Sequence, residues 1–168
     1  INISQLVINK TLKKVIKRNT FTVTINKDFN QVIALCADAP FRQEETWIVD
    51  PMIAAYKLLH KQGKAHSIEV WHNEQLVGGL YGVAVNGYFS GESMFYRQSN
   101  ASKIALVYLA ELLKSINVEF IDCQMLNPFL ANMGCIEVTR EQFLQYQSTA
   151  KKIIPPINFW QTKTLAYI

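Results

Sequence analysis

Polar and apolar residues separate at helical spacing near the start of the chain. Leu12, Val15 and Ile16 recur at helical offsets, while lysines occupy another face of the same segment. This pattern predicts an amphipathic helix that is apolar on the inside and basic on the outside. Residues 21–25 then alternate between the two kinds of side chain, which predicts a strand.

Two further helices are predicted before the middle of the chain. Asp28 can cap the first, which extends through about residue 37. Asp50 and Pro51 form a cap and first-turn pair for the second helix, and Gly63 supplies its stop signal. Both helices therefore have local signals at their ends.

Three β-type runs follow, at residues 67–71, 76–85 and 88–95. The tripeptide His72-Asn73-Glu74 joins the first run to the second, and the hairpin dipeptide Asn86-Gly87 joins the second to the third. Connections this short place consecutive strands side by side, so we predict an antiparallel meander.

The second half of the chain alternates helices with short strands. Ser99 or Asn100 can cap a helix over residues 101–115, and a buried strand over residues 120–125 follows it. Shorter elements complete the chain, namely a helix near Phe129, a strand over residues 136–138 and a helix from Arg140. We therefore expect one α+β domain over residues 1–168.

Composition places the protein among globular chains. Hydrophobic residues make up 49% and charged residues 18%, and no apolar run approaches the roughly 20 residues that cross a bilayer. The chain as given shows no secretory signal, so we expect a soluble, cytoplasmic protein. His60, His66 and His72 are expected on a helix, a loop and a strand end, so we expect no metal site.

The net charge of +4 is concentrated in the first 20 residues. This segment contains no acidic residue, and its five basic residues are Lys10, Lys13, Lys14, Lys17 and Arg18. A compact cationic patch on a nearly neutral body indicates an anionic partner, of which a phosphate backbone is the natural example. The alternative is a solvated helix face that only keeps the domain soluble.

An acidic residue lies in the middle of the third β-type run. Alternation places Glu92 on the same face as Ser90 and Met94. Acidic residues are rare in strands and costly to bury unpaired. Glu92 therefore either faces water or lines a binding pocket. Gly91 beside it favours the pocket, since glycine in a strand often permits the close approach of a ligand.

Two polar residues interrupt the apolar run that begins at Ile121. Asp122 and Gln124 should point to one face of the strand predicted there. Glutamine can donate and accept hydrogen bonds, and aspartate can orient or polarise it, which suits positioning an amine and sharing its proton during acyl transfer. A structural hydrogen-bonded pair at a strand end is the alternative.

A series of short motifs covers most of residues 9–160. In chain order they are Glu45-Thr46-Trp47-Ile48, His66-Ser67-Ile68-Glu69-Val70-Trp71, Leu76-Val77-Gly78-Gly79-Leu80-Tyr81-Gly82-Val83, Gly91-Glu92-Ser93-Met94-Phe95, Asn100-Ala101-Ser102-Lys103, Ile121-Asp122-Cys123-Gln124 and Asn158-Phe159-Trp160. In this order and spacing the chain resembles the leucyl/phenylalanyl-tRNA-protein transferases. Several matches together are far more specific than any single motif.

This resemblance implies an α+β fold similar to that of the acetyltransferase (GNAT) superfamily, with a central, mostly antiparallel sheet flanked by helices. It implies transfer of Leu, Phe or Met from aminoacyl-tRNA to the N-terminal Arg or Lys of acceptor proteins, which marks them for N-degron degradation. No cofactor is implied. Acetyl-CoA enzymes carry a glycine-rich pyrophosphate loop before the helix, whereas residues 97–102 contain no glycine.

The resemblance also implies roles for individual residues. Asp122 would orient or polarise Gln124, which would engage the α-amino group of the acceptor, and Glu92 would help to position the substrates. Trp47 would contact the terminal adenosine, and the basic helix would hold the acceptor stem of the tRNA. The pocket for the transferred side chain would be lined by Leu80, Phe89, Leu106, Leu109, Leu113 and Ile121, with further substrate contacts from Tyr56, Ser93 and Asn127.

The chain differs from the family in one respect, and two alternative functions remain open. Family members carry a small N-terminal domain before the basic helix, and we expect that domain to be absent, since the chain starts almost at the helix. One alternative function is an acyl-CoA-dependent N-acetyltransferase, which the missing glycine loop argues against. The other is a catalytically impaired tRNA-binding domain, which the retention of Glu92, Asp122 and Gln124 disfavours.

Overall fold

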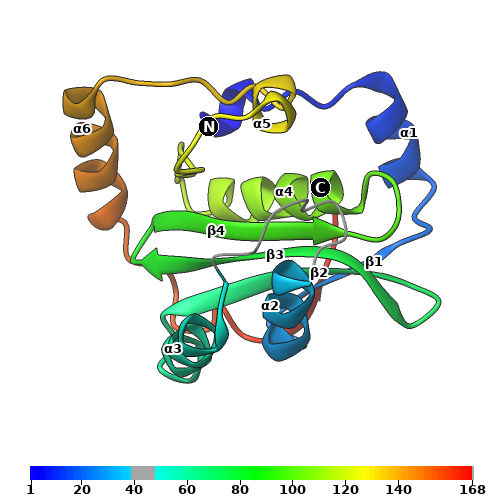
Figure 1. The fold of residues 1–168 in the computed structure, drawn as a ribbon. Helices are drawn as coiled ribbons and strands as arrows, with labels where there is room; N and C mark the ends of the chain where they lie inside the picture. Colours follow the sequence, from blue (N-terminus) through cyan, green and yellow to red (C-terminus); the bar gives the residue numbers. More distant parts are fainter. Residues whose placement is uncertain (39–47, 168) are drawn as a thin grey trace.

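One antiparallel sheet forms the centre of the computed structural model, which describes residues 1–38 and 48–167 (Figure 1). Its strands are β1 (Thr22–Ile25), β2 (Ala65–His72), β3 (Gln75–Val85), β4 (Tyr88–Tyr96) and β5 (Lys163–Leu165). Their order in space is β4-β3-β2-β1-β5, and every neighbouring pair is antiparallel. The predicted meander is confirmed as β2-β3-β4.

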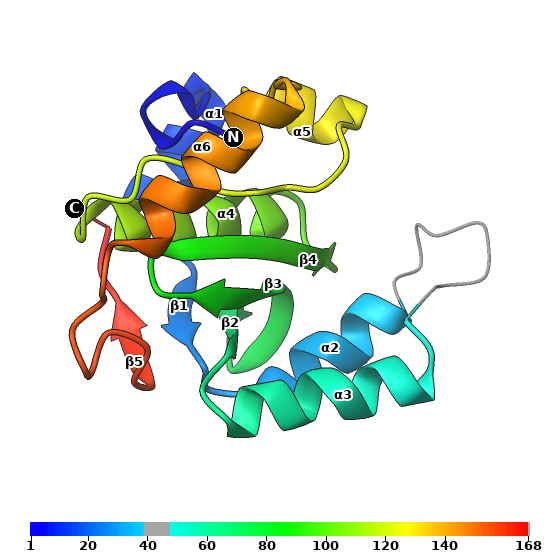
Figure 2. The ribbon, with the colours of Figure 1, turned by 90° about the vertical axis from the view of Figure 1, so that its left-hand side faces the viewer.

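Helices flank this sheet on both faces (Figures 1 and 2). They are η1 (Ile3–Gln5, a 3-10 helix), α1 (Lys10–Lys17), α2 (Phe29–Ala37), α3 (Asp50–Lys61), α4 (Ala101–Lys114), α5 (Pro128–Asn132) and α6 (Arg140–Lys151). Helices α1 and α4 lie over one face, and α2 and α3 over the other. The predicted α+β class is confirmed. Within the described ranges, none of these helices has the length and apolarity to span a bilayer.

Each face of the sheet has its own hydrophobic core, because strand side chains point alternately to opposite faces. Ile68, Val70 and Leu80 belong to the core that α1 and α4 complete. Tyr81 and Phe95 belong to the other core, which α2 and α3 complete. Helix α4 is buried along most of its length, so apolar residues surround its axis instead of forming a single stripe.

The predicted helix starts are partly right. Asp28 caps α2 as predicted, and its side chain accepts a hydrogen bond from the backbone N–H of Gln31 at 3.0 Å. The predicted side-chain cap of α4 is wrong, because Asn100 has a left-handed backbone (φ 70°) and its side chain makes no capping hydrogen bond. Helix α3 already includes Asp50, so its N-cap is Val49 and not Asp50.

Two predicted strands are wrong, those over residues 120–125 and 136–138. In the first segment, only isolated bridges form, one between Phe120 and Asn2 and one between Asp122 and Ser90. The physical reason is the left-handed backbone of Gln124 (φ 60°), which turns the chain out of an extended path.

Strand pairing accounts for two further differences from the predictions. The terminal strand β5 has no strong local signal, yet it pairs with β1 in a register that places Thr164 opposite Thr24. His66, expected in a loop, lies within β2 opposite Gly82 of β3. Strand β5 is completed by β1, which is distant in the sequence, whereas the neighbouring strand β3 is long enough to pair with His66.

Glu69 is a carboxylic acid without exposed surface in the middle of β2. The hydroxyl of Thr24 donates a hydrogen bond to it at 2.6 Å, and the backbone N–H of Lys27 donates at 3.3 Å. The hydroxyl of Ser67 donates to the other carboxyl oxygen. Burial raises the pKa of Glu69, while these hydrogen bonds oppose the rise. The carboxyl group therefore ties β2 to β1 and to the start of α2.

Candidate active site

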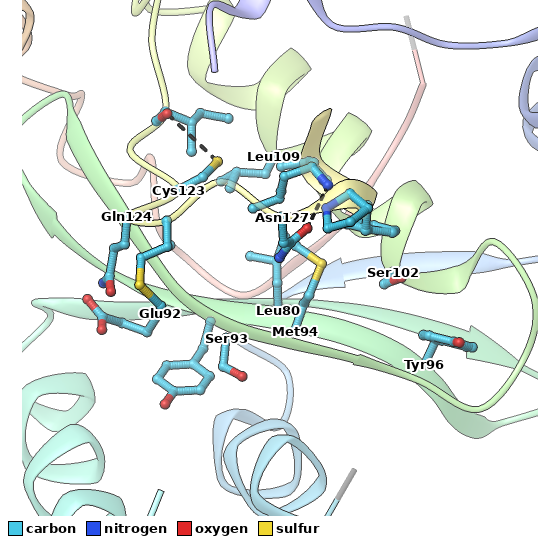
Figure 3. A pocket seen from close by; sticks show the side chains of 18 residues that line it. Leu80, Glu92, Ser93, Met94, Tyr96, Ser102, Leu109, Cys123, Gln124 and Asn127 are labelled. Atoms are coloured by element: carbon cyan, nitrogen blue, oxygen red, sulfur yellow. Dashed lines mark hydrogen bonds between the residues drawn. The ribbon is translucent and has the colours of Figure 1, made fainter. Parts of the chain in front are cut away.

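A cavity of about 520 Å³ lies between α4, the edge strand β4 and the segment that leads through α5 (Figure 3). Most of its wall is apolar. Its lining residues are Leu80, Tyr81, Gly91, Glu92, Ser93, Met94, Tyr96, Ser102, Leu106, Leu109, Ile121, Cys123, Gln124, Met125, Asn127, Pro128, Phe129 and Leu130. In Figure 3, Glu92 and Gln124 lie together at one end of this set, and Ser102 and Tyr96 lie toward the other. The cavity can hold an apolar group beside a carboxylate and an amide.

Most of the residues expected around an apolar side chain lie on this wall. Leu106 and Leu109 contribute from consecutive turns of α4, and Leu80 contributes from β3. Ile121 closes the wall from the segment after α4. Among the expected polar contacts, Ser93 and Asn127 also line the cavity. The side chain of Asn127 additionally caps α5 by accepting a hydrogen bond from the N–H of Leu130.

Phe89 and Leu113, which were also expected on the wall, do not line this cavity. Both are buried in the core that α1 and α4 complete. The ring of Phe89 stacks on Trp160, with ring centroids 5.7 Å apart. Leu113 follows Leu109 by about one helical turn, and the cavity extends along only the first part of α4.

Glu92 occupies an irregularity in the pairing of β4 with β3. Tyr81 lies opposite Ser93 and Gly82 opposite Gly91, so Glu92 is an extra residue, as in a β-bulge. Its carboxylate accepts a hydrogen bond from the hydroxyl of Tyr56 at 2.8 Å. Burial and this carboxylate raise the pKa of Tyr56, which keeps its hydroxyl protonated as a donor. Of the two earlier interpretations, the position of Glu92 on the cavity wall favours the pocket.

Asp122 and Gln124 form a tight turn instead of the strand face expected for them. One carboxylate oxygen of Asp122 accepts a hydrogen bond from the backbone N–H of Gln124 at 2.8 Å. The other accepts one from the hydroxyl of Tyr88 at 2.6 Å. Asp122 therefore orients Gln124 through the backbone, and the Gln124 amide is free to extend toward β4.

Ser90 connects the two ends of this polar cluster. Its hydroxyl accepts a hydrogen bond from Nε2 of Gln124 at 3.3 Å and can donate to Oε1 of Glu92, also at 3.3 Å. Ser90 thus links Gln124 to Glu92, and Asp122 joins them through the backbone of Gln124. Neither Ser90 nor Tyr88 was predicted to have a role, although both lie on β4 near Glu92.

The remaining expected site residues lie apart from the cavity wall. Tyr56 belongs to α3, on the opposite face of the sheet from α4, and reaches the site through its hydrogen bond to Glu92. Trp47 lies outside the described residues. The basic residues expected to bind tRNA are all exposed and lie on α1 or immediately after it, namely Lys10, Lys13, Lys14, Lys17 and Arg18.

The fold and the cavity together describe an α+β domain whose apolar cavity lies beside side chains that can exchange hydrogen bonds with an attacking nucleophile, as a transferase requires. Comparisons with known proteins agree with this class. The sequence profile described as leucyl/phenylalanyl-tRNA protein transferase matches residues 1–148. The chain belongs to the leucyl/phenylalanyl-tRNA protein transferase family.

Individual relatives carry the same description. The protein of Colwellia psychrerythraea is 57% identical, with a match that covers all of this chain and 72% of the relative. The protein of Tolumonas auensis is 42% identical over 97% of this chain and 70% of its own length. The protein of Shigella sonnei is 45% identical over 94% of this chain and 67% of its own length. Each is named as a leucyl/phenylalanyl-tRNA–protein transferase.

Proposed function

We propose that this protein transfers leucyl, phenylalanyl or methionyl groups from aminoacyl-tRNA to the N-terminal Arg or Lys of acceptor proteins, which marks them for N-degron degradation. The observation that carries the proposal is the apolar cavity with Glu92 and Gln124 at one end (Figure 3). Family membership supports the class of donor and acceptor. Because aminoacyl-tRNA is a cytoplasmic donor, the protein acts in the cytoplasm.

The chain acts as one catalytic domain in this proposal, because both hydrophobic cores pack against the same sheet. A relationship to the acetyltransferase superfamily is part of the proposal. It is supported by the antiparallel meander β2-β3-β4, which leads directly into α4.

The cavity selects its donor by burial. Leu80, Leu106 and Leu109 surround the space with carbon, so each CH₂ group that a substrate places there contributes about 0.8 kcal/mol. A charged side chain would lose its hydration without gaining a partner on this part of the wall, which costs several kcal/mol. Leucyl, phenylalanyl and methionyl groups satisfy this requirement, and lysyl or glutamyl groups do not.

The chemical step is an aminolysis of an ester. The α-amino nitrogen of the acceptor forms a bond to the ester carbon, the bond from that carbon to the ribose oxygen of the tRNA breaks, and the proton from nitrogen ends on that oxygen. The amide oxygen of Gln124 accepts a hydrogen bond from the attacking amine, and Asp122 holds Gln124 in place. Glu92 helps to position the substrates, and Trp47 contacts the terminal adenosine.

A transfer assay distinguishes this function from the two alternatives. Peptides beginning with Arg or Lys are incubated with leucyl-tRNA or with acetyl-CoA, and the mass added to the N-terminus is measured. Addition of a leucyl group supports the proposal, and addition of an acetyl group supports an N-acetyltransferase. Binding of tRNA without transfer would identify a tRNA-binding domain that lacks catalysis.

Filling the cavity with Leu109→Trp should change donor preference. Leu109 is 1% exposed and lies on the wall, so the larger ring takes space that a phenylalanyl group needs more than a leucyl group does. The kcat/KM for phenylalanyl transfer should fall about tenfold further than that for leucyl transfer. Leu144→Trp, on the exposed surface of α6, is the control. Equal losses for both donors in folded Leu109→Trp protein would contradict a size-selective wall.

Replacing Lys10, Lys13, Lys14 and Lys17 by glutamine should weaken tRNA binding and flatten its salt dependence. Each phosphate that a lysine neutralises releases condensed counterions, so loss of four contacts lowers the affinity by at least about tenfold near 0.1 M salt. The loss should be similar for all aminoacyl-tRNAs, since backbone contacts do not read bases. Filter-binding titrations across a salt series measure the slope.

Lys61 and Lys64 supply the charge control for this experiment. Both are exposed, Lys61 as the last residue of α3 and Lys64 just after that helix, away from α1, so their replacement by glutamine should leave the salt slope almost unchanged. An unaltered slope in the quadruple variant would eliminate α1 as the tRNA contact. Lys151 and Lys152 at the end of α6 would then be the next candidates.

A further inference from the structure

The hydroxyl of Tyr88 is the side-chain donor from the sheet that fixes the carboxylate of Asp122. Tyr88 is the first residue of β4, and its hydroxyl donates to Oδ2 of Asp122 at 2.6 Å. The opposite oxygen, Oδ1, accepts the backbone N–H of Gln124 at 2.8 Å. Tyr88 and Gln124 therefore hold the carboxylate from two sides.

Backbone hydrogen bonds place the main chain of Asp122 but leave its side chain free to rotate. The N–H of Asp122 donates to the carbonyl of Phe89 at 3.1 Å, and the N–H of Gly91 donates to the carbonyl of Asp122 at 2.8 Å. Neither bond restricts the rotation of the carboxylate about its side-chain bonds. Its orientation therefore depends on the two hydrogen bonds that it accepts.

The conformation of Gln124 makes this orientation important. Its backbone is left-handed (φ 60°), a conformation that crowds the Cβ of an L-residue. The hydrogen bond to Asp122 stabilises that backbone, and the turn directs Nε2 of Gln124 to the hydroxyl of Ser90. If the carboxylate turned away, the backbone could relax and the amide would lose its place at the cavity.

We propose that Tyr88 is a positioning residue for the transfer reaction, acting through Asp122 to hold the Gln124 amide at the end of the cavity. This inference rests on the proposed function of Gln124. Tyr88 does not line the cavity, whose wall on β4 begins at Gly91. Its effect on the reaction is exerted through Asp122.

The surroundings of Tyr88 keep its hydroxyl protonated, so that it remains a hydrogen-bond donor. Burial and the neighbouring Asp122 carboxylate raise the pKa of Tyr88 to about 12, so the phenol keeps its proton at neutral pH. The ammonium group of Lys151 lies 5.4 Å from the centre of the ring, which helps to hold the ring in place.

The test is Tyr88→Phe, which removes the hydroxyl and keeps the ring. We expect kcat for leucyl transfer to fall about fivefold to tenfold, with KM for leucyl-tRNA and thermal stability close to those of the wild type, because the cavity wall and α1 are unchanged. Tyr146→Phe is the matched control, since it removes a phenol hydroxyl from an exposed ring on α6. It should leave kcat and KM unchanged.

Asp122→Ala decides whether Tyr88 acts through Asp122. In that background, Tyr88→Phe should cause no further loss of kcat, because the group that it positions has gone. Equal losses in both backgrounds would overturn the proposal, as would wild-type kcat in Tyr88→Phe.

Amide hydrogen exchange separates this inference from the proposed function. In Tyr88→Phe the Gln124 amide should exchange about tenfold faster, and in Tyr146→Phe at the wild-type rate. If the wild-type protein transferred no aminoacyl group, the proposed function would fail, while this measurement would still report whether Tyr88 holds the turn. Unchanged exchange of Gln124 would refute the positioning role whatever the activity.

Discussion

Replacing Gln124 by alanine is expected to lower kcat/KM for leucyl transfer by about a hundredfold, or 2.7 kcal/mol of transition-state stabilisation. The Gln124 amide lies at the end of the cavity, where it bonds Ser90 and is oriented by Asp122. Removing it takes away the group that engages the attacking amine, while the apolar wall that binds the donor remains. Single-turnover transfer to a peptide with N-terminal Arg measures the effect.

Two comparisons make the Gln124 result specific. Gln145→Ala removes an amide from the exposed surface of α6 and should transfer at the wild-type rate. Asp122→Ala should lower kcat/KM for leucyl transfer at least about tenfold, because the backbone N–H of Gln124 loses its hydrogen-bond acceptor. Wild-type turnover by folded Gln124→Ala would show that the Asp122-Gln124 pair is structural.

Replacing Glu69 by alanine is expected to lower the free energy of unfolding by about 3 kcal/mol or more. The substitution leaves the Thr24 and Ser67 hydroxyls and the Lys27 N–H without their acceptor in a region that water does not reach, and it also creates a cavity. In a chain of this length, such a loss lowers Tm by about 6–12 °C. Urea unfolding and calorimetry measure it.

Ser67→Ala is the matched comparison for Glu69, since it removes one donor and leaves the carboxyl group its other partners. A loss of about 1 kcal/mol is expected for it. The pH dependence gives a second readout. Since burial raises the pKa of Glu69, its contribution to stability is greatest below its ordinary value and falls as pH rises through the folded pKa. The stability advantage of the wild type over Glu69→Gln should therefore shrink as pH rises.

Local signals in the sequence were sufficient for elements whose ends and partners lie close together. The Asp28 cap acts within three residues, and the Asn86-Gly87 turn joins two strands that pair directly. The predictions of α2 and of the β3-β4 hairpin are therefore confirmed. The amphipathic spacing of α1 was equally local, and Leu12 and Ile16 are its buried residues.

Features that depend on distant contacts could not be predicted in this way. Strand β5 pairs with β1, from which it is separated by most of the sequence. No property of residues 163–165 alone indicates which strand they pair with. The strand predicted over residues 120–125 fails for a similar reason. Its apolar composition predicted a buried strand, but only Ile121 is buried and Met125 is exposed. The left-handed backbone of Gln124 and the hydrogen bond from Tyr88 to Asp122 determine the path of this segment.

In the candidate site, too, features with a local sequence signal could be predicted, and features that depend on distant contacts could not. Leu106 and Leu109, which helical spacing places on one face, both line the cavity, but helical spacing could not tell where along α4 the cavity ends, and Leu113 lies in the core instead. Strict alternation in β4 could not anticipate the extra residue at Glu92. The connecting hydroxyl of Ser90 gains its role only from the turn that approaches it, which no local pattern encodes.

The bulge at Glu92 and the bridge from Asp122 also have a consequence for solubility during folding and storage. Strand β4 is an outer strand, and a long, flat outer strand can template pairing with another copy and start aggregation. Here Asp122 already occupies hydrogen-bonding positions beside Ser90, and the bulge distorts the next residues. At the opposite border of the sheet, β5 is only three residues long. Neither border offers a second molecule a long, regular run of hydrogen-bonding groups.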